Sequence, residues 1–487
     1  MKTMIPRDRS QYSKNFFVNL PAMVTGAALC SLLLAPAAVT AQDDKAGFLG
    51  PKSSLDFHGY TRLGLGASGE GGGTQAEFRY PEHDSTFRLG NEPNTNIELA
   101  WDYTYDLSDT ILPEQDSKVQ LFFMLDDFKE FGDSSDVSVG NVQNAYAKFH
   151  DFLPNGIDVW IGRRYYKRMG IHANDNFWLN TGQGAHAGAG LEDIPMPSGD
   201  LSVAVFRYED DPAAPVLGLD ELGNAGDDTI NSTALDVRWE NINLAENHTL
   251  AFYFGTTYRS GQEDGLQVSN KDGLQKVDSE VGFAGGAWIT SVDPLGFGGN
   301  NRLATMYREG AAMVQGTFNG RPIRENSKSG FDLDDSERFE INNAYTVNTS
   351  LVGAQVVAGY IREQRGVDGV KPGAGDTLEI WTLGVRPHFF LSQYVSVVTE
   401  VGTQYFDDEI NDVSGDLTKA TLALQLHPEA KFFSRPVLRA FVTGATWSSE
   451  FKGLSGSGRA IGSGPDDAPF GDDTNGYTFG VQWEAWW

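Results

Sequence analysis

The sequence predicts an all-β protein, a transmembrane antiparallel β-barrel of roughly sixteen to eighteen strands in one domain. Three observations lead to this fold class. Segments of about ten residues alternate apolar and polar side chains, as tilted membrane strands do. Long stretches rich in Gly, Asp, Asn, Ser and Pro separate them, and a compact water-soluble domain rarely tolerates such loops. Beyond the N-terminal segment, no apolar run approaches the ~20 residues that a spanning helix needs.

The N-terminus has the layout of a secretory signal peptide. Four basic residues within the first fourteen positions precede an apolar run over residues 16–38, and Val-Thr-Ala at 39–41 precedes an acidic stretch. We expect cleavage after Ala41. Residues 1–41 are then the signal peptide, residues 42–54 a short periplasmic segment, and residues 55–487 a single barrel domain.

The composition excludes several classes of protein. The only cysteine, Cys30, lies in the expected signal, so the exported chain would carry no disulfide, and a closed barrel in lipid offers another source of stability. Leu29 is the wrong size for lipoprotein processing at Cys30. A formal net charge of −29 argues against a nucleic-acid partner.

We expect neither an enzyme nor a resident cofactor. The eight histidines are scattered, without Gly-x-Ser-x-Gly or His-Glu-x-x-His, although a barrel lipase or protease would carry no local signature. Acidic pairs at residues 466–467 and 472–473 lack regular calcium-loop spacing, so we expect solvated loop charge there and no metal.

The first predicted strand, residues 55–65, shows the alternation clearly. One face carries leucines, Phe57 and Thr61, and the other carries His58, Tyr60 and Arg62. Similar segments occur at residues 95–105, 119–126, 395–405 and 477–487, whereas the pattern is least clean between about 200 and 380.

The segment 477–487 has the character of a closing strand, with an aromatic face suited to lipid and a polar face suited to a pore. Trp486 belongs to the polar set, as does Tyr60 on the first strand. A ring beside a charged donor such as Arg62 suits sugar binding, because apolar C–H patches pack on the ring while hydroxyls exchange hydrogen bonds with the charged group.

These residues belong to a larger pattern that resembles the maltoporin family of outer-membrane sugar channels. The resemblance runs from about Leu55 to Trp487 and is carried by FHGYTRLGLG (57–66), RLGNE (88–92), GRRYYKR (162–168), GAGLE (188–192), SRPVLR (434–439) and the closing WEAWW. It implies a multi-pass protein of a Gram-negative outer membrane, a homotrimer of eighteen-stranded barrels in lipid. Each pore would be narrowed by an inward-folded third loop and would pass malto-oligosaccharides along an aromatic slide beside a polar track.

The resemblance also assigns site residues. The aromatic slide would be Tyr60, Phe297, Phe433 and Trp486, and the constriction Phe177. The polar track would be Arg62, Arg88, Glu98, Arg168 and Asp175.

The chain departs from the family pattern at several of these positions. Asn96 stands where a slide tyrosine is usual, Phe177 lacks the hydroxyl of the usual tyrosine, and Ser138 and Gly170 stand where an arginine and an aspartate are expected. Pro93 occupies a position of the absent loop disulfide, and Phe131 is a candidate for the aromatic that a neighbouring subunit lends.

These departures leave the solute open. A porin of the same fold for another sugar such as sucrose, or one without selectivity, remains an alternative, and a barrel enzyme is a remote one. A surface receptor role for phage or other binders would be additional to transport.

Overall fold

A computed structural model gives the structure of residues 52–487, apart from residues 70–74, 81–82, 84, 108–115, 131–140, 209–230, 268–273, 315–332, 334, 367–372, 374, 453–454, 457–458, 461–469 and 471–472. The expected signal peptide, residues 42–51 of the expected periplasmic segment, and the singled-out positions Phe131, Ser138, Asp466, Asp467 and Asp472 lie outside the described residues.

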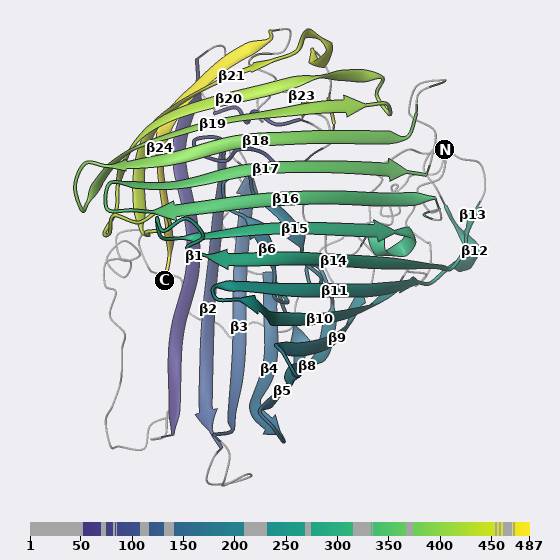
Figure 1. The fold of residues 1–487 in the computed structure, drawn as a ribbon. Helices are drawn as coiled ribbons and strands as arrows, with labels where there is room; N and C mark the ends of the chain where they lie inside the picture. Colours follow the sequence, from purple (N-terminus) through teal and green to yellow (C-terminus); the bar gives the residue numbers. More distant parts are fainter. Residues whose placement is uncertain are drawn as a thin grey trace, which may run out of the picture. The chain divides into compact units, whose positions relative to one another are not determined.

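Eighteen strands form one closed antiparallel sheet (Figure 1). Its strands are β1 (Ser53–Ser68), β2 (Asn94–Asp106), β3 (Lys118–Glu130), β4 (Asn141–Leu153), β5 (Ile157–Arg163), β8 (Ala187–Pro195), β9 (Asp200–Tyr208), β10 (Ser232–Ala245), β11 (His248–Arg259), β14 (Glu280–Val292), β15 (Asn300–Glu309), β16 (Ser336–Asn348), β17 (Val352–Arg365), β18 (Thr377–Phe390), β19 (Val395–Asp408), β20 (Val413–Leu426), β21 (Val437–Trp447) and β24 (Asn475–Trp486).

Among the described residues, the remaining elements are short and lie outside this sheet. They are three small hairpins, β6 (Met169–Ile171) with β7 (Asn176–Leu179), β12 (Gln262–Gln267) with β13 (Leu274–Val277), and β22 (Ser455–Gly456) with β23 (Arg459–Ala460), and two 3₁₀ turns, η2 (Gly310–Val314) and η3 (Ser449–Phe451). Within the described ranges, no helix has the length and apolar character to cross a membrane.

The sheet closes where the last strand pairs with the first. β24 runs antiparallel to β1 from the pair Tyr60 and Trp486 to the pair Ser68 and Thr478. Every wall strand therefore has two hydrogen-bonded neighbours, and no strand edge is left to be satisfied by solvent. The all-β, eighteen-stranded barrel expected from the sequence is confirmed.

The two faces of the wall have opposite character. On β19 the exposed set includes Val401 and Tyr405, whereas the buried set includes Glu400, Gln404 and Asp408. Apolar side chains thus point outward and polar ones inward, the reverse of a water-soluble sandwich and the expected pattern for a wall in lipid. The outward rings of Phe57, Trp101 and Trp487 gather near one end of the wall, with ring centroids less than 6 Å apart in each adjacent pair.

Two connecting segments cover much of the inner face. The described residues between 75 and 93, which connect β1 and β2, contact β19 to β21: the Leu89 amide donates to Glu400 Oε1 (3.0 Å), and the Thr443 hydroxyl donates to the Gly90 carbonyl (3.0 Å). Phe87 of this segment packs where a Cβ at Gly384 or Gly402 would lie about 2.1 Å from its ring, so these two glycines make room for it.

Residues 164–186, between β5 and β8, contact the inner faces of strands far from their own. Asn176 donates to Asn342 of β16 (3.0 Å), and the Ala173 amide donates to Gln355 of β17 (2.9 Å). Trp178 also meets Trp288 of β14 edge to face. Ile171, Trp178 and Leu179 form one buried apolar cluster with small wall residues such as Ala251, Ala284 and Ala304.

This cluster accounts for part of the weak sequence pattern between about 200 and 380. Where the loop covers β11, β14 and β15, inward residues such as Ala251, Ala284 and Ala304 are apolar, so their contrast with the outward side chains is reduced. The inner face of β16 and β17 keeps buried charges such as Glu340 and Glu363.

A charge placed on the outward face should destabilise the barrel far more than one placed on the inner face. Leu422 lies near the middle of β20 and is 51% exposed outward. We expect Leu422→Arg to lower the free energy of unfolding in lipid by about 2–4 kcal/mol. The inward, exposed His58 is the control, and His58→Arg should change it by about 0.5 kcal/mol or less. Urea unfolding in vesicles measures both, and equal losses would contradict the assigned orientation of the wall.

Candidate functional site

The polar face of the closing strand meets that of the first strand at Tyr60 and Trp486, which are directly opposite one another. The Tyr60 hydroxyl donates to Glu484 Oε1 (3.2 Å) and accepts from Arg62 Nη1 (3.1 Å) and Arg88 Nη2 (3.2 Å). These three contacts use the full hydrogen-bonding capacity of a phenol, so the ring is held rigidly.

Glu484 forms ion pairs with three arginines, Arg88, Arg435 and Arg439. Its Oε2 lies 2.7 Å from a guanidinium nitrogen of Arg435 and of Arg439, and Arg88 lies 3.4 Å from Oε1. The carboxylate side chain is 1% exposed. Buried charges of this kind are tolerated only when they are paired and hydrogen-bonded, as they are here.

A second carboxylate, Glu92, joins Arg62 (2.5 Å) and Arg88 (2.8 Å). A third, Glu400, binds Arg386 (2.5 Å) and Lys419 (2.8 Å), and Arg386 also donates to the Ala173 carbonyl (3.0 Å). This set of paired charges, Arg62, Arg88, Glu92, Arg386, Glu400, Lys419, Arg435, Arg439 and Glu484, is called the lumenal charge network below.

Aromatic rings surround His172, a residue of the segment 164–186. Its ring centroid lies 5.5 Å from that of Phe433, 6.1 Å from Trp486 and 6.2 Å from Phe432. The guanidinium carbon of Arg435 lies 4.1 Å from the Trp486 ring centroid, a cation–π contact that covers one face of the indole.

Both ring nitrogens of His172 face guanidinium groups. Nδ1 lies 3.1 Å from Arg88 and Nε2 lies 3.2 Å from Arg435. Burial first, and then the neighbouring positive charges, hold the pKa of His172 well below its ordinary range. The imidazole is therefore neutral at neutral pH.

The segment 164–186 also presents Arg168 between two rings. Its guanidinium carbon lies 4.4 Å from the Phe177 ring centroid and 4.8 Å from that of Tyr165. A Cβ at Gly170 would come within 2.7 Å of the Phe177 ring, so Gly170 and Phe177 depart from the family pattern as a packed pair.

The first strands of the wall face this segment. Burial and the nearby Glu98 carboxylate raise the pKa of Tyr165 to about 12. Glu98 is partly buried and lies in register between Tyr60 and Asp126. Glu98, Tyr165 and Arg168 therefore lie close to one another.

The structure brings most of the sequence-predicted site residues together. Tyr60, Arg62, Arg88, Phe433 and Trp486 lie in or against the lumenal charge network, and Asp175 reaches it through Arg88 at 3.6 Å. Glu98, Arg168 and Phe177 form the neighbouring group just described.

Phe297 is placed apart from both groups. It lies in the turn between β14 and β15 and is 55% exposed.

Several residues of the site were not singled out from the sequence. Glu484, Arg435 and Arg439 could have been found, because they are charges within or beside the quoted motifs and Glu484 shares the polar face of Trp486. No sequence signal points to His172, because its loop is positioned only by tertiary contacts.

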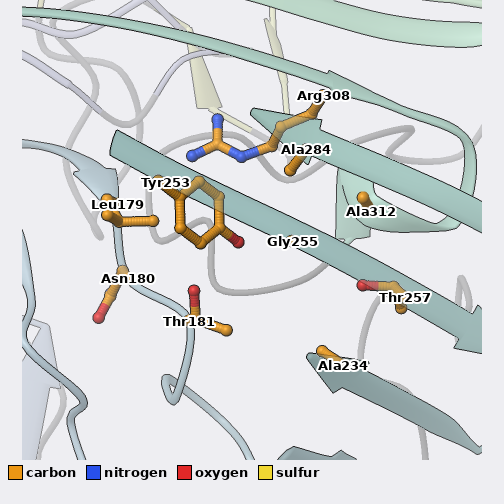
Figure 2. A pocket seen from close by; sticks show the side chains of 10 residues that line it. All are labelled: Leu179, Asn180, Thr181, Ala234, Tyr253, Gly255, Thr257, Ala284, Arg308 and Ala312. Atoms are coloured by element: carbon orange, nitrogen blue, oxygen red, sulfur yellow. The ribbon is translucent and has the colours of Figure 1, made fainter. Parts of the chain in front are cut away.

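A small pocket lies behind the segment 164–186 (Figure 2). Leu179, Asn180 and Thr181 line one side, and Tyr253 of β11 and Arg308 of β15 line the other. Arg308 also donates to the Trp178 carbonyl and pairs with Glu340 of β16 (2.7 Å). With room for about a single water molecule, this pocket belongs to the packing of the loop on the wall.

Across the parts of the chain that the structure describes, no three His, Cys, Asp or Glu side chains gather as metal ligands would.

The LamB porin family model matches residues 55–487, the whole of the barrel. The chain belongs to the LamB porin family. It is thus a multi-pass outer-membrane porin, and the confirmed resemblance agrees with the closed eighteen-stranded wall.

Solved structures with a similar chain trace include the anion-selective porin from Comamonas acidovorans (11% identity, 89% of this chain and 99% of that chain, TM-score 0.40). Others are Salmonella typhi OmpF in complex with daunomycin (11%, 89% and 98%, 0.39) and the trimer form of Vibrio cholerae OmpT (12%, 89% and 99%, 0.34). At these scores the similarities carry no argument about the solute of this LamB porin.

Removing the charge of Glu484 should destabilise the protein strongly, because it leaves Arg435 and Arg439 buried without their shared anion. We expect Glu484→Gln to lower the free energy of unfolding by about 3–5 kcal/mol. The control is Glu429→Gln, which removes an exposed ion pair with Lys431 and should cost about 0–1 kcal/mol. Urea unfolding in vesicles compares them, and similar stabilities would show that Glu484 is not the anchor of the network.

The neutral state of His172 predicts a pH dependence with a defined sign. The pKa of His172 in the folded state lies below the ordinary ~6.5. As the pH falls through that value, His172 of the unfolded chain is protonated while that of the folded protein stays neutral, so the free energy of unfolding decreases. Between pH 6.5 and 5, the wild type should therefore lose stability faster than His172→Gln, by up to about 1.4 kcal/mol per pH unit. Between pH 7 and 8 the slopes should agree. Parallel slopes over the whole range would contradict the assignment.

Proposed function

We propose that this LamB porin is a channel for the facilitated, passive diffusion of malto-oligosaccharides and related neutral carbohydrates. The observation that carries the proposal is that Tyr60 lies opposite Trp486, and that Trp486 and Phe433 both pack near His172, beside the lumenal charge network. Rings next to fixed donors and acceptors match the two surfaces of a sugar, its apolar C–H patches and its hydroxyl rim.

The charge network supports this reading because its members are already paired. The carboxylates hold the arginines in fixed positions beside the rings, with six cationic groups sharing three carboxylates. Their side chains are at most 10% exposed, so the network orients the wall that carries the rings more than it offers a free charge to a solute.

We further propose a homotrimer in outer-membrane lipid, with residues 164–186 as the inward-folded third loop that narrows each pore at Phe177. The contacts of this segment with Asn342 and Gln355 on the far wall support its inward course. Cross-linking of the purified protein in detergent tests the trimer, and a monomer at all concentrations would overturn it.

A porin of the same fold for another sugar, such as sucrose, is the second candidate. Asn96 in place of a slide tyrosine, and the coupled pair Gly170 and Phe177, favour a shifted preference. A series of maltotriose, longer glucans and sucrose in planar bilayers separates the two candidates. Block of the ion current by none of these sugars would contradict a sugar channel altogether.

Replacement of Trp486 tests the aromatic path directly. Trp486→Ala should weaken sugar block roughly three- to tenfold, as expected from the loss of one stacking ring, while open conductance changes less. Trp381→Ala is the matched control, because this indole is 54% exposed on the outward face of β18. Equal effects of the two substitutions on block would exclude a direct contact between Trp486 and the sugar.

A further inference from the structure

Phe128, near the end of β3, is an aromatic residue in an unusual position. It is 51% exposed and lies in register opposite Asn96, on the face that also carries Glu98 and Asp126. Other exposed aromatic side chains of the described wall strands, such as Phe123, Tyr405 and Phe479, belong to the outward set. Among the exposed Phe, Tyr and Trp rings of the described wall strands, Phe128 alone shares the inward face.

Other inward phenylalanines are covered by protein partly, as Phe122 is against Tyr146, or fully. Phe206 of β9 is 0% exposed against Trp160 and Tyr166, and Phe406 of β19 is 0% exposed against Tyr80. A ring that has no polar atom gains nothing from water, so an inward ring left open is suited to a solute that covers it.

The strand register gives the position of Phe128 relative to the aromatic path. One register row across the wall contains Trp486, Tyr60, Glu98 and Asp126. The adjacent row, two residues further along the strands on the same face, contains Arg62, Asn96 and Phe128. Phe128 is two strands and two residues from Tyr60, a backbone separation of about 12 Å from standard sheet spacings. An oligosaccharide lying on Tyr60 is long enough to reach it.

Polar groups border the ring as they border Tyr60. Glu98 and Asp126 lie in the adjacent row on the same face, and Arg62 lies in the same row as Phe128. Gln143 donates to Asp126 Oδ2 (2.7 Å), which holds this carboxylate in place two residues from Phe128.

We propose that Phe128 supplies the stacking surface that Asn96 lacks, so that a pyranose ring of a neutral oligosaccharide packs on Phe128 while its hydroxyls contact Glu98. The aromatic path of this chain is then continued on β3 rather than on β2. This inference rests on the proposed function, because it requires that a sugar enters the pore.

Sugar block of the ion current by maltotriose and a longer glucan tests the proposal in planar bilayers. Phe128→Ala and Phe128→Leu should each weaken block roughly three- to tenfold, since leucine keeps apolar area but removes the flat ring. Phe128→Tyr keeps the ring and should stay within about twofold of wild type. Phe123→Ala on the outward face of the same strand is the matched control and should leave block unchanged.

The outcomes separate this inference from the function beneath it. If wild type is blocked and the alanine and leucine variants of Phe128 are blocked equally well, the inference fails and the sugar channel stands. If Phe123→Ala weakens block as much as Phe128→Ala, the effect comes from β3 folding and the inference also fails. If neither sugar blocks wild type, the proposed function and the inference fall together.

Discussion

The buried carboxylate of Glu484 is the interaction on which the lumen depends. It accepts a hydrogen bond from Tyr60 of the first strand. It also forms ion pairs with Arg88 of the segment 75–93, Arg435 of the turn before β21 and Arg439 of β21 itself. Each of these donors would be costly to bury alone, so the carboxylate and its partners must be positioned together. The pairing of β24 with β1 makes this possible, because it places the last strand beside the first.

The closed wall in turn allows the lumen to be so highly charged. The ladder hydrogen bonds satisfy the backbone groups of the wall, and the outward apolar face is stabilised by lipid. Two inward segments then fill part of the interior and meet each other, since the Arg88 amide donates to the Ala173 carbonyl (3.1 Å). The inward face of β1 to β3 keeps partly open side chains, including Tyr60, Glu98 and Phe128, and faces the group around Arg168.

Prediction from the sequence succeeded where side-chain contrast follows strand geometry. In β1, β2, β19 and β24 the inward residues are polar and the outward ones apolar, so a period of two reveals both the strand and its facing. It was weakest between about 200 and 380, where the inner face of β11, β14 and β15 is partly apolar under loop residues such as Trp178. The facing of the strand residues Tyr60, Glu98 and Trp486 was therefore predicted correctly. Phe297, which was assigned by a loose resemblance, lies in a turn away from the other site residues.

The sequence by itself determined the barrel, its family and the facing of its clearest strands, because these depend on local alternation and on motifs that are contiguous in the chain. Only the tertiary structure decided the partners. His172 between two arginines, Arg435 over Trp486, and Phe128 opposite Asn96 depend on loop paths and strand register. These contacts join residues far apart in sequence, and their energies come from burial and geometry that no local pattern encodes.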